Sequence, residues 1–337
     1  MKVGILGGGQ LGRMLLQAAA NYDLTTYVLE KDPNCPAAHL CHHFSVGDIL
    51  DYDTVYQFGK QLDALTIEIE AVNVDALTQL EKEGVKIYPT PAAIRTIKNK
   101  IAQKQFYADN EIPSSNFVIT HTAQEIQQHV DLLPAVHKLA EGGYDGKGVQ
   151  VIENEKSIAL GFNAPAVLEE KVNIVKELAL IVGMNAKGET VIFPPAEMIF
   201  DQVYNLLDYQ LSPAKIEEKQ LWRAEAIARK VVQSLKSPGL FAIELFVDQN
   251  NTDPLYLESR VKNYNPFAVK LLEEKSHLLS VTALHMNNSA ESIDLVFKNR
   301  FSIGNEVISR LNSTILDTYL PKLRSHELYL RSLSKNP

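Results

Sequence analysis

Short apolar runs alternate with amphipathic stretches over the first ninety residues. The runs that predict strands are residues 3–6, 25–29, 62–70 and 85–89. Apolar positions from Met14 to Ala20, and again through Leu77 and Leu80, recur at helical spacing and predict helices between these strands. Strands that alternate with helices form a parallel sheet covered on both faces. We therefore predict a doubly wound α/β domain over residues 1–109.

The pattern changes after residue 90. Residues 91–110 are helical and basic, and strand-like and helical segments then mix without regular alternation. The predicted strands are 117–119, 134–139, 176–183, 239–247 and 255–258, and the predicted helix is 222–235. This mixture is typical of an α+β fold. We predict a small domain over residues 110–172 and a larger one over residues 173–337.

A glycine-rich segment separates two of these strands. Gly142, Gly143, Gly146 and Gly148 surround Tyr144, Asp145 and Lys147. Glycines at this density supply positive φ angles and exposed N–H groups, which suit a mobile flap over phosphates. Lys138, at the end of the preceding strand, and Lys147 could reach the same anion. A glycine-rich hairpin turn with solvated lysines is the alternative that this segment leaves open.

A second glycine turn, residues 7–12, joins the first strand to the first helix. In this context backbone N–H groups and the helix dipole converge on a phosphate or a carboxylate. Glu30 ends the next strand, where a dinucleotide fold places its ribose-binding acid. An NAD-binding protein would leave residues 142–148 unexplained. We expect the ligand crevice where the turn, Glu68 and Glu70 converge.

Several charged residues stand in apolar surroundings. Glu244 and Glu258 each interrupt an apolar strand, and with Asn265 they could clamp magnesium through hard oxygen ligands. Exposure on the solvent face of a sheet is the alternative. Residues 169–172 could present a hinge to a purine edge, with Glu177 accepting from ribose hydroxyls, or could form a charged linker. Lys100 and Lys138 would complete a cationic cage for phosphates.

Composition limits the classes of protein. Of 337 residues, 45% are hydrophobic and 22% charged, as in globular proteins, and the net charge of −8 argues against general binding to nucleic acid or anionic membranes. The cysteines, Cys35 and Cys41, are too few for a disulfide framework. No apolar run is long enough to span a bilayer, and no signal peptide precedes the first strand. We expect a cytoplasmic protein with neither nucleic-acid nor membrane partners.

Taken in chain order, these motifs resemble the ATP-grasp family, in particular its N5-carboxyaminoimidazole ribonucleotide synthases of purine biosynthesis. The segments that carry the resemblance are 4–14, 67–72, 100–106 and 142–150, and it extends over residues 1–265. It implies an ATP-grasp fold with ATP held between the second and third domains and the ribonucleotide over the first. It also implies a ligase that uses ATP, Mg²⁺, bicarbonate and aminoimidazole ribonucleotide, and suggests a homodimer.

The resemblance implies a role for each matching residue. Nucleotide contacts would come from Lys100, Lys138, Gly143, Gly146, Gly148, Glu169, Glu170, Val172 and Glu177. Substrate contacts would come from Gly9, Gln10, Leu11, Glu70, Tyr144 and Asp145. Glu244 and Glu258 would bind magnesium, and Lys147, Lys262 and Asn265 would act in catalysis.

The carboxyl-terminal half departs from the family pattern. Lys262 stands where the family has arginine, and Tyr264 where it has histidine. Lysine loses the bidentate fork of arginine, and tyrosine cannot carry protons near neutral pH. The family's basic cluster near its carboxyl end has no counterpart here, so we expect an altered acceptor half. Two alternatives stay open: an ATP-grasp ligase that joins a different carboxylate and amine, and a catalytically silent nucleotide-binding paralogue.

Overall fold

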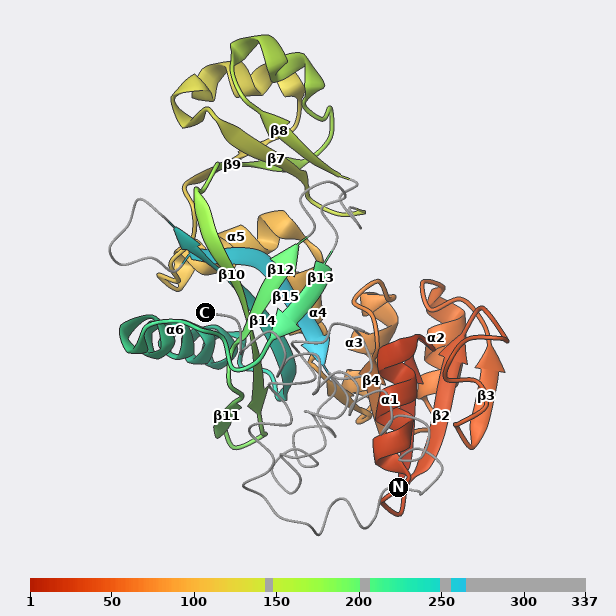
Figure 1. Cartoon of the computed structure of the whole chain (residues 1–337). Helices are drawn as coiled ribbons and strands as arrows, with labels where there is room; N and C mark the ends of the chain where they lie inside the picture. Colours follow the sequence, from red (N-terminus) through yellow and green to blue (C-terminus); the bar gives the residue numbers. More distant parts are fainter. Residues whose placement is uncertain (143–147, 201–206, 249–255, 265–337) are drawn as a thin grey trace, which may run out of the picture. The chain divides into compact units, whose positions relative to one another are not determined.

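The computed structural model describes residues 1–142, 148–200, 207–248 and, as a strand backbone, 256–264. Within these residues the chain forms three sheets, of five, four and six strands. Figure 1 shows them in chain order, from the red amino-terminal sheet to the blue strand β15. Each predicted domain range contains one sheet among its described residues.

The first sheet is parallel throughout, in the order β3-β2-β1-β4-β5. Its strands are β1 (Lys2–Leu6), β2 (Thr25–Glu30), β3 (His43–Val46), β4 (Ala64–Ile67) and β5 (Lys86–Tyr88). Its helices are α1 (Gln10–Ala19), α2 (Tyr52–Gly59), α3 (Val74–Lys82) and α4 (Pro91–Lys98). The strand order reverses between β1 and β4, so the carboxyl ends of these two strands mark the ligand-binding edge of such a sheet.

Burial on both faces of this sheet explains its continuous apolar strands. Leu16 of α1 packs with Ile5 and Val28 on one face. Leu6 and Leu29 pack on the other face with α2, α3 and Ile94 of α4. The doubly wound prediction is therefore confirmed. Two elements were not predicted, β3 and α2, because the half-buried strand β3 carries a weak apolar signal.

The second sheet is antiparallel, in the order β6-β9-β7-β8. It consists of β6 (Phe117–Thr120), β7 (Ala135–Leu139), β8 (Val149–Ile152) and β9 (Ala166–Glu170). The 3-10 segments η1 (Ala123–Leu132) and η2 (Glu155–Leu160) supply Ile126 and Ile158 to a core on one face. Ala135 and Leu168 come from the strands, so the alternate positions Lys138 and Glu169 belong to the opposite face.

The third sheet follows the order β13-β12-β10-β14-β15, and β11 also pairs with β10. Its strands are β10 (Ile174–Met184), β11 (Thr190–Ile192), β12 (Ala196–Phe200), β13 (Leu207–Leu211), β14 (Gly239–Asp248) and β15 (Tyr256–Tyr264). One face is covered by α6 (Glu218–Leu235), whose Ile227 and Val231 pack against Leu180 and Ile243. β11, β12 and β13 were not predicted from the sequence.

Helix α5 (Lys100–Asp109) follows α4 after the single residue Asn99, whose side chain accepts from the N–H of Ala102 and caps the helix. Tyr107 of α5 is buried in the same core as α6 and the third sheet. Lys104 of α5 is fully buried as well. One helix thus contributes an apolar side chain to a core and a charged side chain to the interior.

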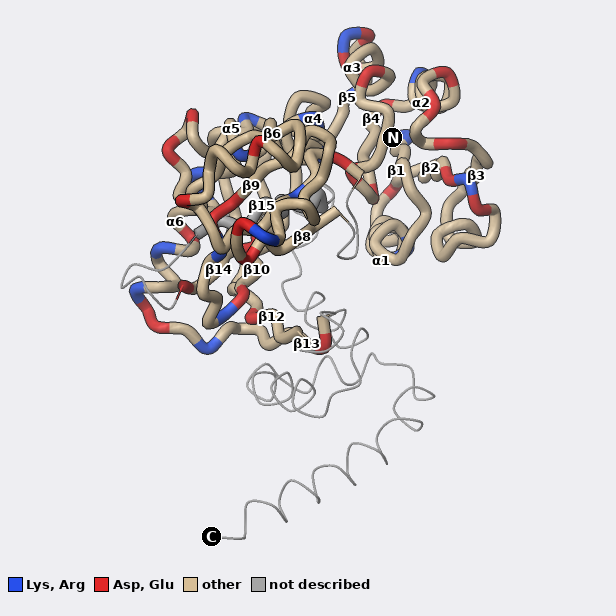
Figure 2. Tube along the Cα trace, turned by 90° about the horizontal axis from the view of Figure 1, so that it is seen from above, with Lys and Arg blue, Asp and Glu red and all other residues tan. Residues whose placement is uncertain are grey.

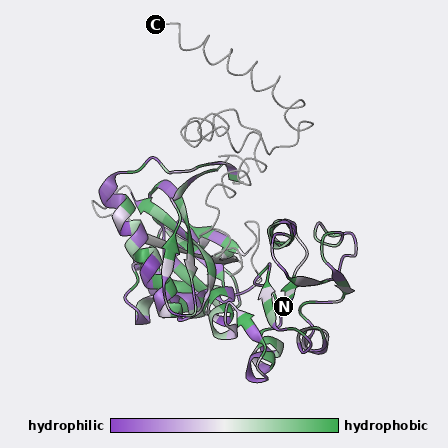
Figure 3. Ribbon diagram, turned by 90° about the horizontal axis from the view of Figure 1, so that it is seen from below, coloured by the Kyte–Doolittle hydropathy of each residue, from purple (hydrophilic) through white to green (hydrophobic). Residues whose placement is uncertain are grey.

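The distribution of charged and hydrophobic residues along the described chain is that of an ordinary globular protein, as the composition indicated. Acidic and basic residues are interspersed along the described trace (Figure 2). Hydrophobic residues lie mainly on the strands, while α6 alternates between hydrophilic and hydrophobic positions (Figure 3). Within the described residues, no helix combines the length and apolar character needed to span a bilayer.

The buried His137 makes the second sheet sensitive to acid. Its Nδ1 accepts from the N–H of Phe162 (3.1 Å), and Nε2 lies 2.8 Å from Thr120 Oγ1, so Nε2 carries the proton of a neutral ring. Burial lowers the pKa of His137 below its ordinary value.

We expect the free energy of unfolding to fall as pH drops below about 6.5, where an unfolded histidine binds a proton that the folded ring does not. Above that pH the ring is neutral in both the folded and the unfolded chain, so His137 adds no pH dependence to the free energy of unfolding. His137→Gln should flatten the acid side of the curve of unfolding free energy against pH. Chemical denaturation between about pH 5 and about pH 8, limits that lie roughly one to two units from the pKa of an unfolded histidine, measures this. His39→Gln, at an exposed histidine, is the control and should leave the slope intact.

Candidate active site

The glycine turn before α1 is closed by a carboxylate of the chain itself. Backbone N–H groups of Gly9, Leu11 and Gly12 donate to Glu68, which follows β4. The approach is close: a Cβ added to Gly9 would lie 2.5 Å from Glu68 Oε1. The predicted convergence of the turn and Glu68 is therefore observed. The amides of Gly9 and Leu11, expected to contact substrate, already have an internal acceptor.

Glu30 also serves the turn. Its Oε2 accepts from the N–H of Gly8 (3.1 Å), and its Oε1 accepts from the N–H of Lys31 (2.7 Å). Burial raises the pKa of Glu68, the turn's N–H groups oppose that rise, and the nearby Glu30 adds to it. With Glu68 at the helix N-terminus and Glu30 bonded to the backbone, the two features that suggested a dinucleotide are occupied by internal bonds.

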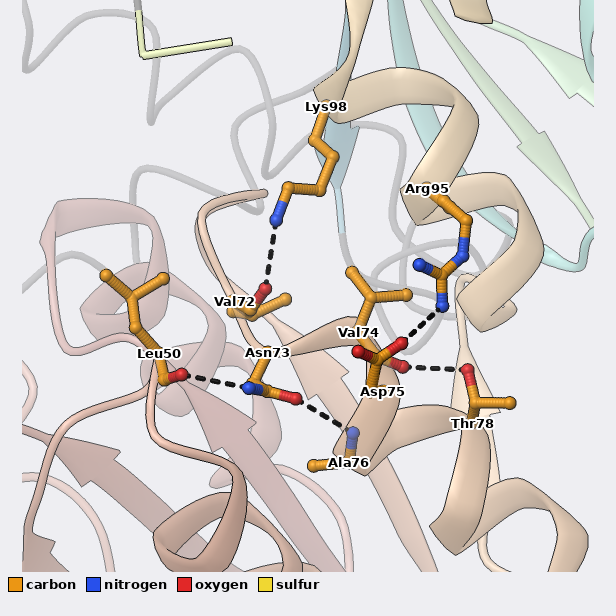
Figure 4. A network of polar contacts seen from close by, with 9 residues as sticks. All are labelled: Leu50, Val72, Asn73, Val74, Asp75, Ala76, Thr78, Arg95 and Lys98. Atoms are coloured by element: carbon orange, nitrogen blue, oxygen red, sulfur yellow. Dashed lines mark hydrogen bonds and ion pairs between the residues drawn. The ribbon is translucent and has the colours of Figure 1, made fainter.

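The loop after β4, which carries Glu68 and Glu70, is tied to helix α4. Lys98 Nζ donates to the carbonyl of Val72 (3.3 Å), and Arg95 pairs with Asp75 (2.8 Å) at the start of α3. Figure 4 shows both contacts, together with the bond from Asn73 to the carbonyl of Leu50. Glu70 is half-buried in this loop, near the ligand-binding edge of the first sheet.

Three charged side chains meet between α5 and the second sheet. Lys104 Nζ lies 3.1 Å from Glu169 Oε2, and Lys138 Nζ lies 3.4 Å from the same oxygen. Ser115 donates its hydroxyl to that oxygen as well (3.1 Å). Burial by itself would raise the pKa of Glu169, but the charges of Lys138 and Lys104 outweigh burial and hold this pKa below its ordinary value. The carboxylate therefore stays charged. We call Lys104, Lys138 and Glu169 the buried charge cluster.

Lys104 was not predicted as a site residue. The available signal was its position on α5: it stands three residues before the buried Tyr107 and next to the buried Gln103, on the stripe where an apolar residue is expected. Glu169 was predicted to line a purine, yet its side chain is committed to the two lysines. Its backbone pairs in the sheet with Phe117 and Val136.

Lys100 lies beside the base of the glycine-rich segment. Its N–H donates to the carbonyl of Ala140 (2.9 Å), two residues beyond Lys138. Gly142 and Gly148 both have positive φ, 79° and 82°, as predicted, and Leu139 N–H donates to the carbonyl of Gly148 (2.9 Å). The segment therefore connects the antiparallel strands β7 and β8, and the two cations predicted for phosphate lie at its base.

The third sheet presents two predicted carboxylates on one face. Ala179 pairs with Glu244 across β10 and β14, and Glu177 pairs with Phe246. The alternate pairs, Leu178 with Leu245 and Leu180 with Ile243, face α6. Glu177 and Glu244 therefore belong to the face opposite α6. Glu244 is 8% exposed, so the predicted alternative of a solvent-facing acid does not hold for this residue.

Strand β15 brings the second predicted metal residue next to the first along the backbone. The ladder pairs Leu245 with Leu257 and Ile243 with Val261, so residues 258–260 lie opposite Glu244 in an irregular step. Lys262 pairs with Ala242. Among the side chains that the structure describes, no group of three or more His, Cys, Asp or Glu forms a metal site. Two carboxylates supply hard oxygen ligands of the kind that Mg²⁺ accepts beside phosphate oxygens.

Other predicted residues fall in different places. Glu170 is exposed, and its Oε2 accepts from Asn116 (2.8 Å), while Val172 is half-buried between β9 and β10. Residues outside the described ranges are Gly143, Tyr144, Asp145, Gly146, Lys147 and Asn265. Their roles stay predictions, as do those of the side chains of Glu258 and Lys262.

Comparison with known proteins agrees with this geometry. A ribonucleotide synthetase pre-ATP-grasp domain matches residues 1–98, and an ATP-grasp domain matches residues 105–258. The crystal structure of N5-carboxyaminoimidazole ribonucleotide synthetase from Thermotoga maritima is similar at 32% identity and a TM-score of 0.69. That match covers 77% of this chain and 68% of the other.

The chain belongs to the ATP-grasp family. A phosphoribosylaminoimidazole carboxylase from Vigna aconitifolia is 34% identical over 252 residues, 73% of this chain, although the chain spans only 44% of that relative's length. A third similar protein is the N5-carboxyaminoimidazole synthase of Aspergillus clavatus, in complex with ADP and 5-aminoimidazole ribonucleotide. It is 29% identical, with a TM-score of 0.69 over 77% of this chain and 69% of that one.

Family membership assigns the described parts of the chain. The first sheet is the pre-ATP-grasp domain, and the second and third sheets form the ATP-grasp domain. The face bearing Glu177 and Glu244 lies in the ATP-grasp domain, and so do Lys138 and Glu169 of the buried charge cluster. Lys104, on α5, stands one residue before the matched range begins. The expected α/β and ATP-grasp fold is confirmed.

Replacing Glu68 tests its structural role. Glu68→Ala leaves three N–H donors without their acceptor and should lower the free energy of unfolding by about 1–3 kcal/mol. Chemical denaturation measures this. Glu70→Ala, two residues away in the same loop, is the matched control and should change stability by less than about 0.5 kcal/mol. Equal losses in the two variants would contradict the role given to Glu68.

Proposed function

We propose that the chain is an ATP-dependent ligase that carboxylates 5-aminoimidazole ribonucleotide. The products are N5-carboxyaminoimidazole ribonucleotide, ADP and phosphate. One observation carries the proposal: the similar structure from Aspergillus clavatus holds ADP and 5-aminoimidazole ribonucleotide, and its similarity spans 77% of this chain. The chain's own lysines and carboxylates supply the kinds of charge that such a reaction uses, and this supports the proposal.

Positive charge for the phosphates comes from two elements. Lys138 projects from β7 on the face opposite the apolar core, and Lys100 begins α5 beside Ala140. Both would contact the phosphates of ATP. Phosphoryl transfer depends mainly on positioning and on neutralising charge, so ammonium groups held by strands and helix termini suit this task. The segment 142–148 would cover the phosphates and exclude water from a labile intermediate.

The third sheet would hold the rest of the nucleotide. Glu177 would accept hydrogen bonds from the ribose hydroxyls, and the connection from Glu170 to Val172 would border the adenine. Glu169 would contribute there through its backbone, because its carboxylate is bound to the two lysines. Glu244 and Glu258 would hold Mg²⁺, which neutralises phosphate charge when bound.

The proposed reaction has two steps, phosphorylation of bicarbonate and transfer of its carboxyl group to the amine. A bicarbonate oxygen attacks the γ-phosphorus, the bond to the β-phosphate oxygen breaks, and ADP leaves with the bonding electrons. The exocyclic amine of the ribonucleotide then forms a C–N bond with the carboxyl carbon. Phosphate leaves and the amine loses a proton. Gly9, Gln10, Leu11, Glu70, Tyr144 and Asp145 are the proposed ribonucleotide contacts, and Lys147, Lys262 and Asn265 the proposed catalytic residues.

A second candidate keeps the ATP chemistry but joins a different carboxylate to a different amine. It is favoured by Lys262 and Tyr264, which stand where the resemblance places arginine and histidine. The compartment and assembly belong to the proposal as well: a cytoplasmic homodimer that acts on small molecules.

Turnover assays separate the two candidates. ADP formation with Mg²⁺ and bicarbonate should rise when 5-aminoimidazole ribonucleotide is added, and N5-carboxyaminoimidazole ribonucleotide should be detected as product. ADP formation that responds neither to bicarbonate nor to the ribonucleotide would reject the proposed reaction and support the second candidate.

Glu244→Gln tests the metal site. Loss of one carboxylate charge beside the phosphates should reduce kcat by about 100-fold, the usual effect of removing one stabilising group from a charged transition state. ATP turnover at saturating Mg²⁺ measures this. Glu189→Gln, at an exposed glutamate in the turn before β11, is the control and should retain full activity. Unchanged turnover in Glu244→Gln would refute the assignment.

A further inference from the structure

Lys104 is a buried charge to which the proposed reaction gives no role. Its side chain is 0% exposed, and its three ammonium protons have three acceptors at hydrogen-bond distance. These are Ser114 Oγ at 2.6 Å, Ser115 Oγ at 3.0 Å and Glu169 Oε2 at 3.1 Å. The ring of Phe117 lies 5.5 Å away. Burying a charge without such partners costs much free energy, so these contacts stabilise the buried ammonium group of Lys104.

The carboxylate of Glu169 contacts the ammonium groups of two lysines. Its Oε2 contacts Lys104 at 3.1 Å and Lys138 at 3.4 Å, whereas Oε1 is buried with no hydrogen-bond partner among the described residues. The lysine that is nearer is also the one that is fully enclosed. Lys138, the more distant partner, is 9% exposed and is the lysine proposed to reach ATP.

We propose that Lys104 is a positioning residue that weakens the hold of Glu169 on Lys138 and so leaves the Lys138 ammonium able to bind the phosphates of ATP. The inference rests on the proposed function, in which Lys138 contacts ATP. Without Lys104, the carboxylate would direct its full attraction to Lys138. In a poorly solvated interior that attraction is strong, and ATP would have to compete with it.

The first test removes the charge of Lys104 and retains its length. In Lys104→Met the Kd for Mg-ATP, measured by isothermal titration calorimetry, should rise about tenfold, within the range that contacting charged residues produce. In turnover assays KM for ATP should rise more than kcat falls. Lys156→Met, at an exposed lysine of η2, is the matched control and should bind ATP like the wild type.

A second variant separates positioning from a purely structural role. In Lys104→Met/Glu169→Gln the carboxylate that competes for Lys138 is also gone, so Kd should return to within about threefold of the wild type, since the two changes act on one ion pair. A structural role predicts the opposite, because the double variant loses more buried bonds than the single one. Binding as weak as in Lys104→Met would overturn the proposal.

The outcomes distinguish this inference from the proposed function. If the wild-type chain does not bind Mg-ATP, the proposed function fails and the inference fails with it. If the wild type binds and Lys104→Met binds equally well, only the inference is overturned. Should Lys104→Met fail to fold, Glu169→Gln alone decides: equal or tighter ATP binding supports the inference, and weaker binding refutes it.

Discussion

Glu169 is a residue with 5% of its surface exposed, and its carboxylate cannot remain charged unless cations accompany it. Three elements of the chain meet to satisfy that constraint. Glu169 lies in β9, and its cations come from β7 and from α5. Helix α5 also buries Tyr107 in the core that joins α6 and the third sheet. The same helix therefore meets an electrostatic requirement in the second sheet and an apolar one in the third.

Internal carboxylates occupy positions that ligands hold in other folds. Glu68 accepts from N–H groups at the N-terminus of α1, where a dinucleotide fold binds pyrophosphate, and Glu30 accepts from the N–H of Gly8. The N–H groups of a turn closed in this way have acceptors before any substrate arrives. The proposed ribonucleotide contacts at this edge of the first sheet would then use groups other than these N–H donors, such as Glu70 in the loop that Lys98 bonds to from α4.

Strand alternation places the charged groups on the faces where phosphates could meet them. In the second sheet, Ala135 and Leu168 face the η1 and η2 core, so Lys138 and Glu169 take the opposite face. In the third, Leu180 and Ile243 face α6, so Glu177 and Glu244 take the opposite face. In each sheet one face is buried in an apolar core and the other carries polar groups. Four of the described residues proposed for ATP and its metal lie on these polar faces: Lys138, Glu169, Glu177 and Glu244.

Local sequence determined the features that depend on neighbours in the chain. Apolar periodicity predicted the parallel sheet, and glycine content predicted the positive φ of Gly142 and Gly148. The apolar pattern of the local sequence also identified Glu244 as an acid in an apolar strand. Short, half-buried strands such as β3 and β11 were missed because their periodicity is weak. Only the tertiary structure decided that Glu68 closes the turn and that Glu169 unites Lys104 with Lys138, because those partners lie far apart in sequence and are brought together by sheet pairing and burial.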